Sequence, residues 1–323
     1  MNASAANPTG LRDRLVVAPE VAAALAEGRP AVALESTLIS HGLPYPQSVD
    51  VARAAELAVR ESGAVPATVA IHAGRIMVGL SEDQLGTLAT TRGVLKAARP
   101  NLSIALAGRG WAATTVSATM IAAAAAGIGV FATGGIGGVH RGALGVPASP
   151  SPPTLDISSD LEELARTPVA VVCAGPKAIL DVPATLEYLE TRGVPVVAVG
   201  TDEMPGFWSR GSGVAAPASV ADVAGAARIV ATHATLGLGS GILLCVPVPE
   251  ADAYPLTDAR AAVERAIADS LAAGIEGPAL TPWLLARVAE ITAGGSVRAN
   301  VALIVNNARV AGQLAAALAD GVP

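Results

Sequence analysis

The most reactive side chain in this sequence is predicted to be Lys177, which follows the apolar run Val169–Ala174 after a Gly-Pro pair. Apolar surroundings disfavour the charged form of an amine, so a lysine there becomes a usable nucleophile. The alternative is a lysine whose stem lies on apolar surface and whose amine reaches solvent. Only Lys96 and Lys177 among the 21 basic residues are lysines. Arginine supplies every other cation, which suggests that these two positions need an amine.

A carboxylate, Glu35, directly follows the apolar run Ala31–Leu34. Ligands of open α/β sheets bind beyond the carboxyl ends of strands, and a carboxylate there is well placed for general acid or base catalysis. The alternative is a structural carboxylate that caps a turn or pairs with an arginine. His41 follows in a Gly/Pro-rich loop, and it is either a functional histidine or a surface or hydrogen-bonded loop histidine.

A glycine-rich stretch from Thr133 to Gly142 follows the apolar run Gly129–Ala132. Dense glycines allow backbone N–H groups to approach a ligand closely, as phosphate sites require. The stretch is not a dinucleotide fingerprint, because His140 stands where the last glycine is needed. It is not a P-loop either, since no Gly-Lys-Ser/Thr follows.

A second polar stretch contains Asp156, Ser158, Ser159 and Asp160. Two carboxylates with hydroxyls between them can hold a hard divalent cation or a sugar phosphate. The alternative is helix capping, with Ser158 or Ser159 as the N-cap and Glu162 near the third helical position.

Short apolar runs alternate with helical stretches and must position these groups. The predicted strands are Ala31–Leu34, Thr68–Ile71, Ser103–Ala107, Gly129–Ala132, Val169–Ala174, Val194–Val199 and Gly241–Val246. The predicted helices are Pro46–Ser62, Thr115–Ala126, Pro183–Arg192, Ser219–Thr232, Asp258–Ala273, Thr281–Thr292 and Ser296–Leu318. Strands that do not alternate are typical of a sheet buried on both faces, so we predict a three-layer α/β/α fold with one mostly parallel or mixed central sheet.

Composition limits the classes of function. The chain has 323 residues, 52% of them hydrophobic, and a net charge of −6 without a basic block, which argues against a dedicated nucleic-acid binder. Cys173 and Cys245 lie in apolar runs and indicate buried thiols in a reducing, cytoplasmic compartment. The uncharged stretch Gly110–Val139 is broken by glycines, so we expect a buried helix and strand there and no membrane span.

We expect residues 1–14 to be a flexible N-terminus and residues 15–323 to form a single catalytic domain. The proline-rich stretch Gly145–Pro153 predicts a surface loop or flap.

Taken together, several strings resemble the pseudouridine-5'-phosphate glycosidases, also called indigoidine synthase A-like proteins. They are LESTLISHGLPYPQ, TTVSATMIAAAAAGIGVFATGGIGGVHRGA, DISSDLEELA, VVCAGPKAILD, TPWLLARV and SVRANVALIVNNA, in the family's order from about residue 15 to 318. The resemblance implies reversible cleavage of the C–C glycosidic bond of pseudouridine 5'-phosphate to uracil and ribose 5-phosphate. It also implies an α/β/α homotrimer that uses a divalent cation, typically Mn²⁺.

Carried over by position, the resemblance makes Glu35 the proton donor and acceptor and Lys177 the nucleophile at the sugar C1. It makes Asp156 the metal-site aspartate. The implied substrate-binding residues are Lys96, Val116, Thr133, His140, Ser158, Ser159, Asp160 and Asn300. Two alternatives remain at this point: an imine-forming lyase acting on another sugar phosphate, and a sugar-phosphate sensor without catalytic activity.

Overall fold

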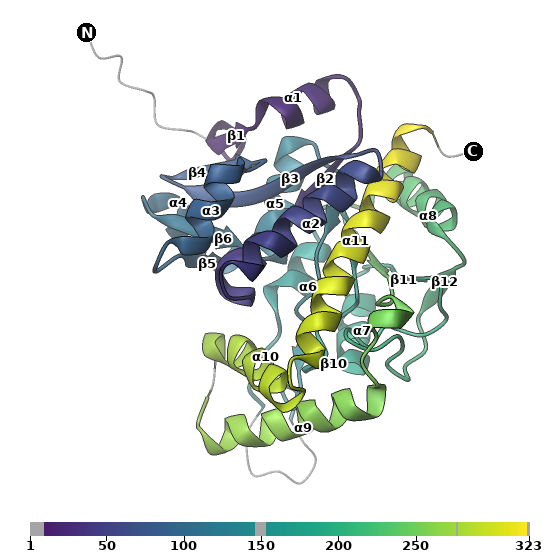
Figure 1. Ribbon diagram of the computed structural model, residues 1–323. Helices are drawn as coiled ribbons and strands as arrows, with labels where there is room; N and C mark the ends of the chain where they lie inside the picture. The colour runs from purple at the N-terminus through teal and green to yellow at the C-terminus, as the bar shows by residue number, and fades with distance from the viewer. Residues whose placement is uncertain (1–9, 146–152, 276, 322–323) are drawn as a thin grey trace.

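The computed structural model describes residues 10–145, 153–275 and 277–321, as a central sheet with helices on both faces (Figure 1). Within these residues, eleven strands form one sheet in the order β1-β4-β3-β2-β7-β9-β13-β11-β12, with β6 beside β3 and β5 beside β6. Their bounds are β1 Leu15–Val17, β2 Ala31–Leu34, β3 Val65–His72, β4 Arg75–Val78, β5 Leu95–Ala97, β6 Trp111–Thr114, β7 Val130–Ala132, β9 Ala170–Cys173, β11 Val196–Val199, β12 Ala218–Val220 and β13 Ile242–Cys245. A separate antiparallel pair joins β8 (Val139–His140) to β10 (Leu180–Asp181).

The sheet is mixed and mostly parallel, as predicted. The strands from β3 through β2, β7, β9, β13 and β11 to β12 all run parallel to their neighbours. The second half of β3 instead pairs antiparallel with β4 and β6. The two cysteines, Cys173 and Cys245, are free, buried and opposite each other on β9 and β13, which confirms that they are buried thiols.

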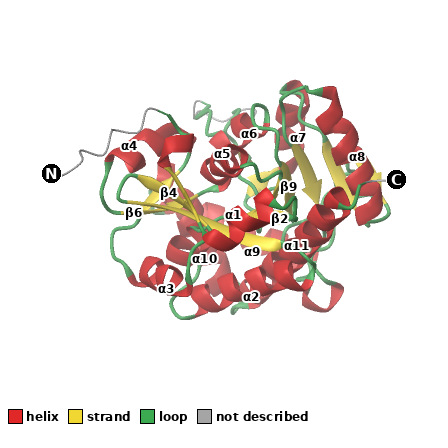
Figure 2. Cartoon of the chain, turned by 90° about the horizontal axis from the view of Figure 1, so that it is seen from above, coloured by secondary structure: helices red, strands yellow, loops and turns green. Residues whose placement is uncertain are grey.

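Helices cover both faces of this sheet (Figure 2). Their bounds are α1 Pro19–Ala26, α2 Gln47–Glu61, α3 Glu82–Thr90, α4 Leu102–Ala107, α5 Val116–Ala126, α6 Ser159–Leu164, α7 Val182–Thr191, α8 Val223–Leu236, α9 Leu256–Ala272, α10 Leu280–Ile291 and α11 Gly295–Ala319. Successive strand residues point to opposite faces, so β2 sends Val32 and Leu34 into a core with α2, α8 and α11. Ala31 and Ala33 enter a second core with α1, α5 and α7. The predicted three layers follow from strands that are apolar on both sides.

Helix α11 is long and apolar enough to cross a membrane by length and composition. Leu303 and Leu314 on it are fully buried, and the helix lies along α2 over the sheet (Figure 1). Its apolar character is therefore explained by its place in the core.

One predicted strand and the start of one predicted helix are wrong. Ser103–Ala107 is not a strand but most of helix α4, because Asn101 accepts from the backbone N–H of Ala98 and closes a turn that leads into the helix. Ser219 does not begin a helix; it lies in edge strand β12, and α8 starts at Val223 after the N-cap Asp222.

The uncharged stretch Gly110–Val139 contains the buried helix α5 and strand β7, as predicted. Within the predicted flexible N-terminus, Arg12–Arg14 forms a short 3-10 helix, and residues 1–9 lie outside the described residues. Most of the proline-rich loop, residues 146–152, also lies outside them.

Candidate active site

A cavity of about 830 Å³ opens at the carboxyl edge of the central strands. Both lysines of the chain line it, together with Glu35. The other predicted site residues on its wall are Val116, Thr133, His140, Ser158, Ser159, Asp160 and Asn300. Ten of the eleven predicted site residues therefore meet around one space, and the exception is Asp156, which lies beside His140.

The strand order explains why Glu35, Thr133 and Lys177 meet. They follow β2, β7 and β9, which are adjacent and parallel in the sheet. The carboxyl ends of parallel strands share one edge, so residues that are far apart in the sequence arrive side by side.

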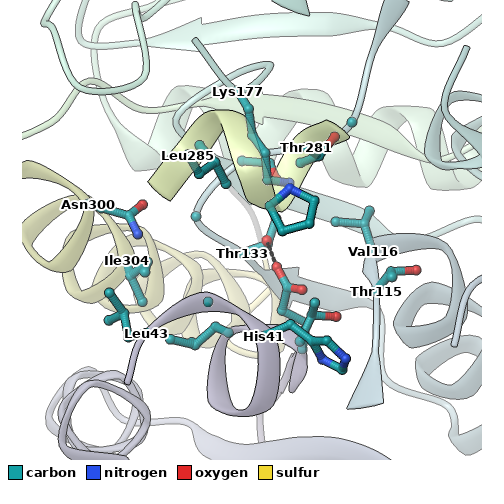
Figure 3. A pocket seen from close by; sticks show the side chains of 18 of the residues that line it. His41, Leu43, Thr115, Val116, Thr133, Lys177, Thr281, Leu285, Asn300 and Ile304 are labelled. Carbon is teal, nitrogen blue, oxygen red and sulfur yellow. Dashed lines mark hydrogen bonds between the residues drawn. The ribbon is translucent and has the colours of Figure 1, made fainter. Parts of the chain in front are cut away.

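Glu35 is part-buried, and its carboxylate accepts a hydrogen bond from the Thr133 hydroxyl, drawn as a dashed line in Figure 3. Burial raises the pKa of the Glu35 carboxyl, while the positive charge of Lys177 and the Thr133 hydrogen bond oppose that rise. A carboxyl with a raised pKa can hold a proton at a pH at which a free glutamate has lost it.

Lys177 enters the cavity from the side opposite His41 (Figure 3). Its Nζ donates to the carbonyl of Gly135 at 2.7 Å, and its backbone N–H donates to the carbonyl of Ile136 at 3.1 Å. The amine is thus held at the cavity wall by a backbone carbonyl, although the side chain is only partly buried.

Close packing explains the glycines between Thr133 and Gly142. A Cβ on Gly137 would lie 2.1 Å from Ser158 Oγ, and one on Gly134 would lie 3.1 Å from Ile304 Cγ1. Several N–H groups of the stretch donate to protein acceptors, including that of Gly137 to Asp160 Oδ2 at 2.9 Å. The glycines thus allow close contact between elements of the protein. The sequence had suggested only close contact between backbone N–H groups and a ligand.

Asp160 joins three parts of the site. It is 6% exposed, and its two carboxylate oxygens accept from the N–H groups of Ser117 at 3.0 Å and Gly137 at 2.9 Å. The capping interpretation is also confirmed, because Ser158 is the N-cap of α6 and accepts from the N–H of Asp160. Ser159 adds a contact of 3.3 Å to the Ser117 hydroxyl.

Lys96 lies on β5, opposite Ala113 of β6. The carbonyl of Ala97, the residue after Lys96, accepts a hydrogen bond from the Thr115 N–H. This pairing brings Lys96 to the N-terminus of α5, where Val116 begins the helix. Lys96 keeps contact with solvent, yet desolvation by the cavity wall lowers the pKa of its amine and the charge of Lys177 lowers it further. An amine and a helix N-terminus together favour an anion.

Asp156 and His140 face each other at the edge of the cavity. His140 Nε2 lies 4.0 Å from Asp156 Oδ2, and the Asp156 side chain is 41% exposed. Burial lowers the pKa of His140, Asp156 raises it, and Lys177 lowers it. Among the described residues no group of three acidic, histidine or cysteine side chains could hold a metal ion. Asp156 offers one carboxylate, the smallest protein contribution that suits an ion keeping most of its own waters.

Sequence reasoning missed several residues of the site. His41 lines the cavity, and its pKa is lowered first by burial and then by Lys96. Thr281 of α10 lies 3.5 Å from His140 Nε2, and Leu285 of the same helix also lines the cavity (Figure 3). Asn307 of α11 donates to the carbonyl of Thr133 at 2.9 Å. Only the histidine had a local signal, its Gly/Pro-rich loop, because the others arrive from distant helices.

Comparison with known proteins identifies the family of this chain. The sequence pattern of the indigoidine synthase A like protein family matches residues 20–317. The chain belongs to this family. A pseudouridine-5'-phosphate glycosidase of Methylobacterium nodulans is 56% identical over 301 residues, covering 93% of this chain and 87% of that protein. One from Deinococcus radiodurans is 52% identical and covers 95% of each chain.

Solved structures of similar chains share the fold of this family member. The prealnumycin C-glycosynthase AlnA, in complex with ribulose 5-phosphate, superposes with a TM-score of 0.86 at 41% identity, over 95% of this chain and 97% of that one. An indigoidine synthase A-like protein from Thermotoga maritima gives 0.82 at 33% identity, over 94% and 96%.

Proposed function

We propose that this chain is a pseudouridine-5'-phosphate glycosidase that reversibly cleaves the C–C glycosidic bond to give uracil and ribose 5-phosphate. The observation that carries the proposal is that Lys177 and Glu35 line one cavity in a chain 56% identical to a protein of that name. The single catalytic domain would comprise residues 15–323.

The chemistry needs an amine because a carbon leaving group departs only when electrons are pushed onto it. Ring opening breaks the bond between C1 and the ring oxygen, which takes a proton, and the Lys177 nitrogen bonds to C1 and loses one. The nitrogen lone pair then forms an imine with C1 of the sugar while the bond from C1 to C5 of uracil breaks. The electron pair of the broken bond stays on C5 of uracil, and C5 takes a proton. Water hydrolyses the imine and releases ribose 5-phosphate.

Glu35 would move the protons in these steps. Its raised pKa lets the carboxyl hold a proton more readily than a free glutamate, which suits a group that must alternately give and take one. The Thr133 hydroxyl, bonded to the carboxylate, would fix its orientation.

The remaining cavity residues would hold the substrate. Lys96 and the start of α5 at Val116 suit the phosphate, and the hydroxyls of Ser158 and Ser159 suit sugar or phosphate oxygens. Asp160 would act by fixing the wall, given its two backbone bonds. His140 and Asn300 would contact the sugar or base.

A divalent cation, Mn²⁺ by family resemblance, would be held by Asp156 through its carboxylate, with water completing the shell and His140 nearby. When bound, such an ion supplies positive charge that stabilises developing negative charge. Titration of Mn²⁺ against the protein, followed by electron paramagnetic resonance, tests the site: Asp156→Asn should weaken binding, and unchanged binding would remove Asp156 from this role.

The test of the function is ultraviolet monitoring of uracil release from pseudouridine 5'-phosphate, with and without Mn²⁺. Borohydride reduction during turnover should add a sugar-phosphate mass at Lys177. Lys177→Ala should lose both turnover and adduct while its thermal melting stays close to that of the parent. Full turnover by Lys177→Ala would refute the covalent route.

An imine-forming enzyme acting on another sugar phosphate is the second candidate, favoured by the likeness to a C-glycosynthase bound to ribulose 5-phosphate. Assays over a panel of sugar phosphates distinguish it: an adduct at Lys177 with another sugar, without uracil release, would replace the first proposal.

We also propose a homotrimer in the cytoplasm, from the family resemblance. Light scattering in solution should give three times the chain mass, and a monomer would refute the trimer.

A further inference from the structure

One short backbone segment, Thr133-Gly134-Gly135, touches both proposed catalytic groups. The Thr133 hydroxyl donates to the Glu35 carboxylate, and the carbonyl of Gly135 accepts from Lys177 Nζ at 2.7 Å. The position of this 133–135 segment therefore sets where the carboxylate and the amine stand relative to each other.

The segment is held from the sheet side by strand β9. The N–H of Thr133 donates to Val172 at 3.0 Å, and the carbonyl of Gly134 accepts from Ala174 at 2.9 Å. These bonds extend the β7–β9 pairing, but they leave the carbonyl of Thr133 to be satisfied from the other side.

Asn307 of α11 supplies that second support. Its Nδ2 donates to the carbonyl of Thr133 at 2.9 Å and to that of Gly134 at 3.2 Å. Only the nitrogen end of an amide can donate, so two carbonyl partners fix the orientation of the side chain. The helix approaches so closely that a Cβ on Gly134 would meet Ile304 at 3.1 Å.

This amide is an unfavourable choice for the core alone. Asn307 is fully buried, and its Oδ1 has no hydrogen-bond partner among the described residues. A buried acceptor without a partner costs stability, and an apolar side chain of the same shape avoids that cost. The donor end, which grips the 133–135 segment, gives a reason for a polar residue at this position.

We propose that Asn307 is a positioning residue: by holding the carbonyls of Thr133 and Gly134 it fixes the Glu35 carboxylate and the Lys177 amine in reactive geometry. This inference rests on the proposed roles of those two groups. Asn307 touches neither of them and acts through the segment.

The test compares Asn307→Leu with Asn306→Leu. The first change removes both donors at similar volume. The second removes the neighbouring amide, which donates to the carbonyl of Pro247 at 3.4 Å, away from the segment. A misplacement of about 1 Å lowers turnover by about 100-fold. We therefore expect kcat for uracil release to fall on the order of 100-fold in Asn307→Leu, with KM within about threefold, and to change less than threefold in Asn306→Leu.

The pH profile separates positioning from a general loss of stability. The charged groups that act on Glu35 are Lys177, Lys96 and Asp160, and none is altered by the change. If the segment shifts, the Thr133 hydrogen bond weakens, so the limb of the kcat profile that reports Glu35 should move to higher pH in Asn307→Leu and should stay in place in Asn306→Leu.

Asn307→Asp provides a second variant, which keeps the shape of the side chain and in its ionised form has acceptors only. It should show the same loss of kcat, measured below the melting transition of each variant. Wild-type kcat and pH profile in either Asn307 variant, or an equal loss in Asn306→Leu, would overturn the proposal.

Hydrogen exchange makes the test independent of the substrate. The peptide containing residues 133–135 should exchange faster in Asn307→Leu than in Asn306→Leu, and equal exchange would overturn the positioning role. If the wild type releases no uracil, the proposed function fails, and this comparison still decides whether Asn307 holds the segment.

Discussion

Replacing Asp160 with asparagine removes the charge at the point where α5, α6 and the glycine-rich stretch meet. The carboxylate accepts from the N–H groups of Ser117 at 3.0 Å and Gly137 at 2.9 Å and is 6% exposed. Asparagine has one acceptor oxygen, so its NH₂ group must face one of these two donors.

The cost follows from this geometry. Hydrogen bonds to a charged acceptor are worth about 1.5–3 kcal/mol each, and a buried donor left without an acceptor costs about 1–3 kcal/mol. The variant loses one such bond outright and weakens the other, while it no longer buries a charge, which offsets part of the loss. We expect the free energy of unfolding to fall by about 2–3 kcal/mol. For a chain of this size that lowers the melting temperature by roughly 3–5 °C.

Differential scanning calorimetry and urea denaturation measure this change, with Asp156→Asn as the control. The Asp156 side chain is 41% exposed, and its charged partner is His140 at 4.0 Å, so its loss should cost less than about 0.5 kcal/mol. Equal melting temperatures for Asp160→Asn and wild type would refute the idea that Asp160 stabilises the fold through its bonds to Ser117 and Gly137. Asp160 would then have a substrate-binding role only.

Three further predictions concern the same cavity. Burial raises the pKa of Glu35 above its ordinary 4.5, so the folded state loses stability as the pH rises above that value. Glu35→Gln removes this ionisation and should therefore unfold at a higher urea concentration than wild type at pH 8. The difference between the two should vanish below pH 4.5, and the variant should lose turnover. A methyl group on Gly137 would lie 2.1 Å from Ser158 Oγ, whereas one on Gly110 meets nothing within 4 Å; Gly137→Ala should destabilise by about 1–3 kcal/mol and Gly110→Ala should not, by calorimetry. Lys96→Met should raise KM for the phosphorylated substrate at least tenfold, with a smaller change in kcat, as measured by steady-state kinetics. An unchanged KM would refute the proposal that Lys96 binds the phosphate.

Local patterns predicted the elements well where the chain's own periodicity decides them. The run Ala31–Leu34 is strand β2 with the predicted bounds, because a short apolar run is stable as a strand covered on both faces. Ser103–Ala107 failed because its apolar content is that of a strand, but its Ile104 is 65% exposed on a short helix. Composition alone does not show which side chains are covered.

The sequence by itself determined the chemical inventory and its approximate place: an amine and a carboxylate at strand ends, two lysines among many arginines, and serines that cap a helix. These follow from residue type and from neighbours within a few positions. The tertiary structure alone decided which groups meet. Asn307 bonds to Thr133, which lies 174 residues away in the sequence. Asp160 bonds to both Ser117 and Gly137 because the strand order brings these residues to it. Such contacts depend on the packing of whole elements, which a local pattern does not encode.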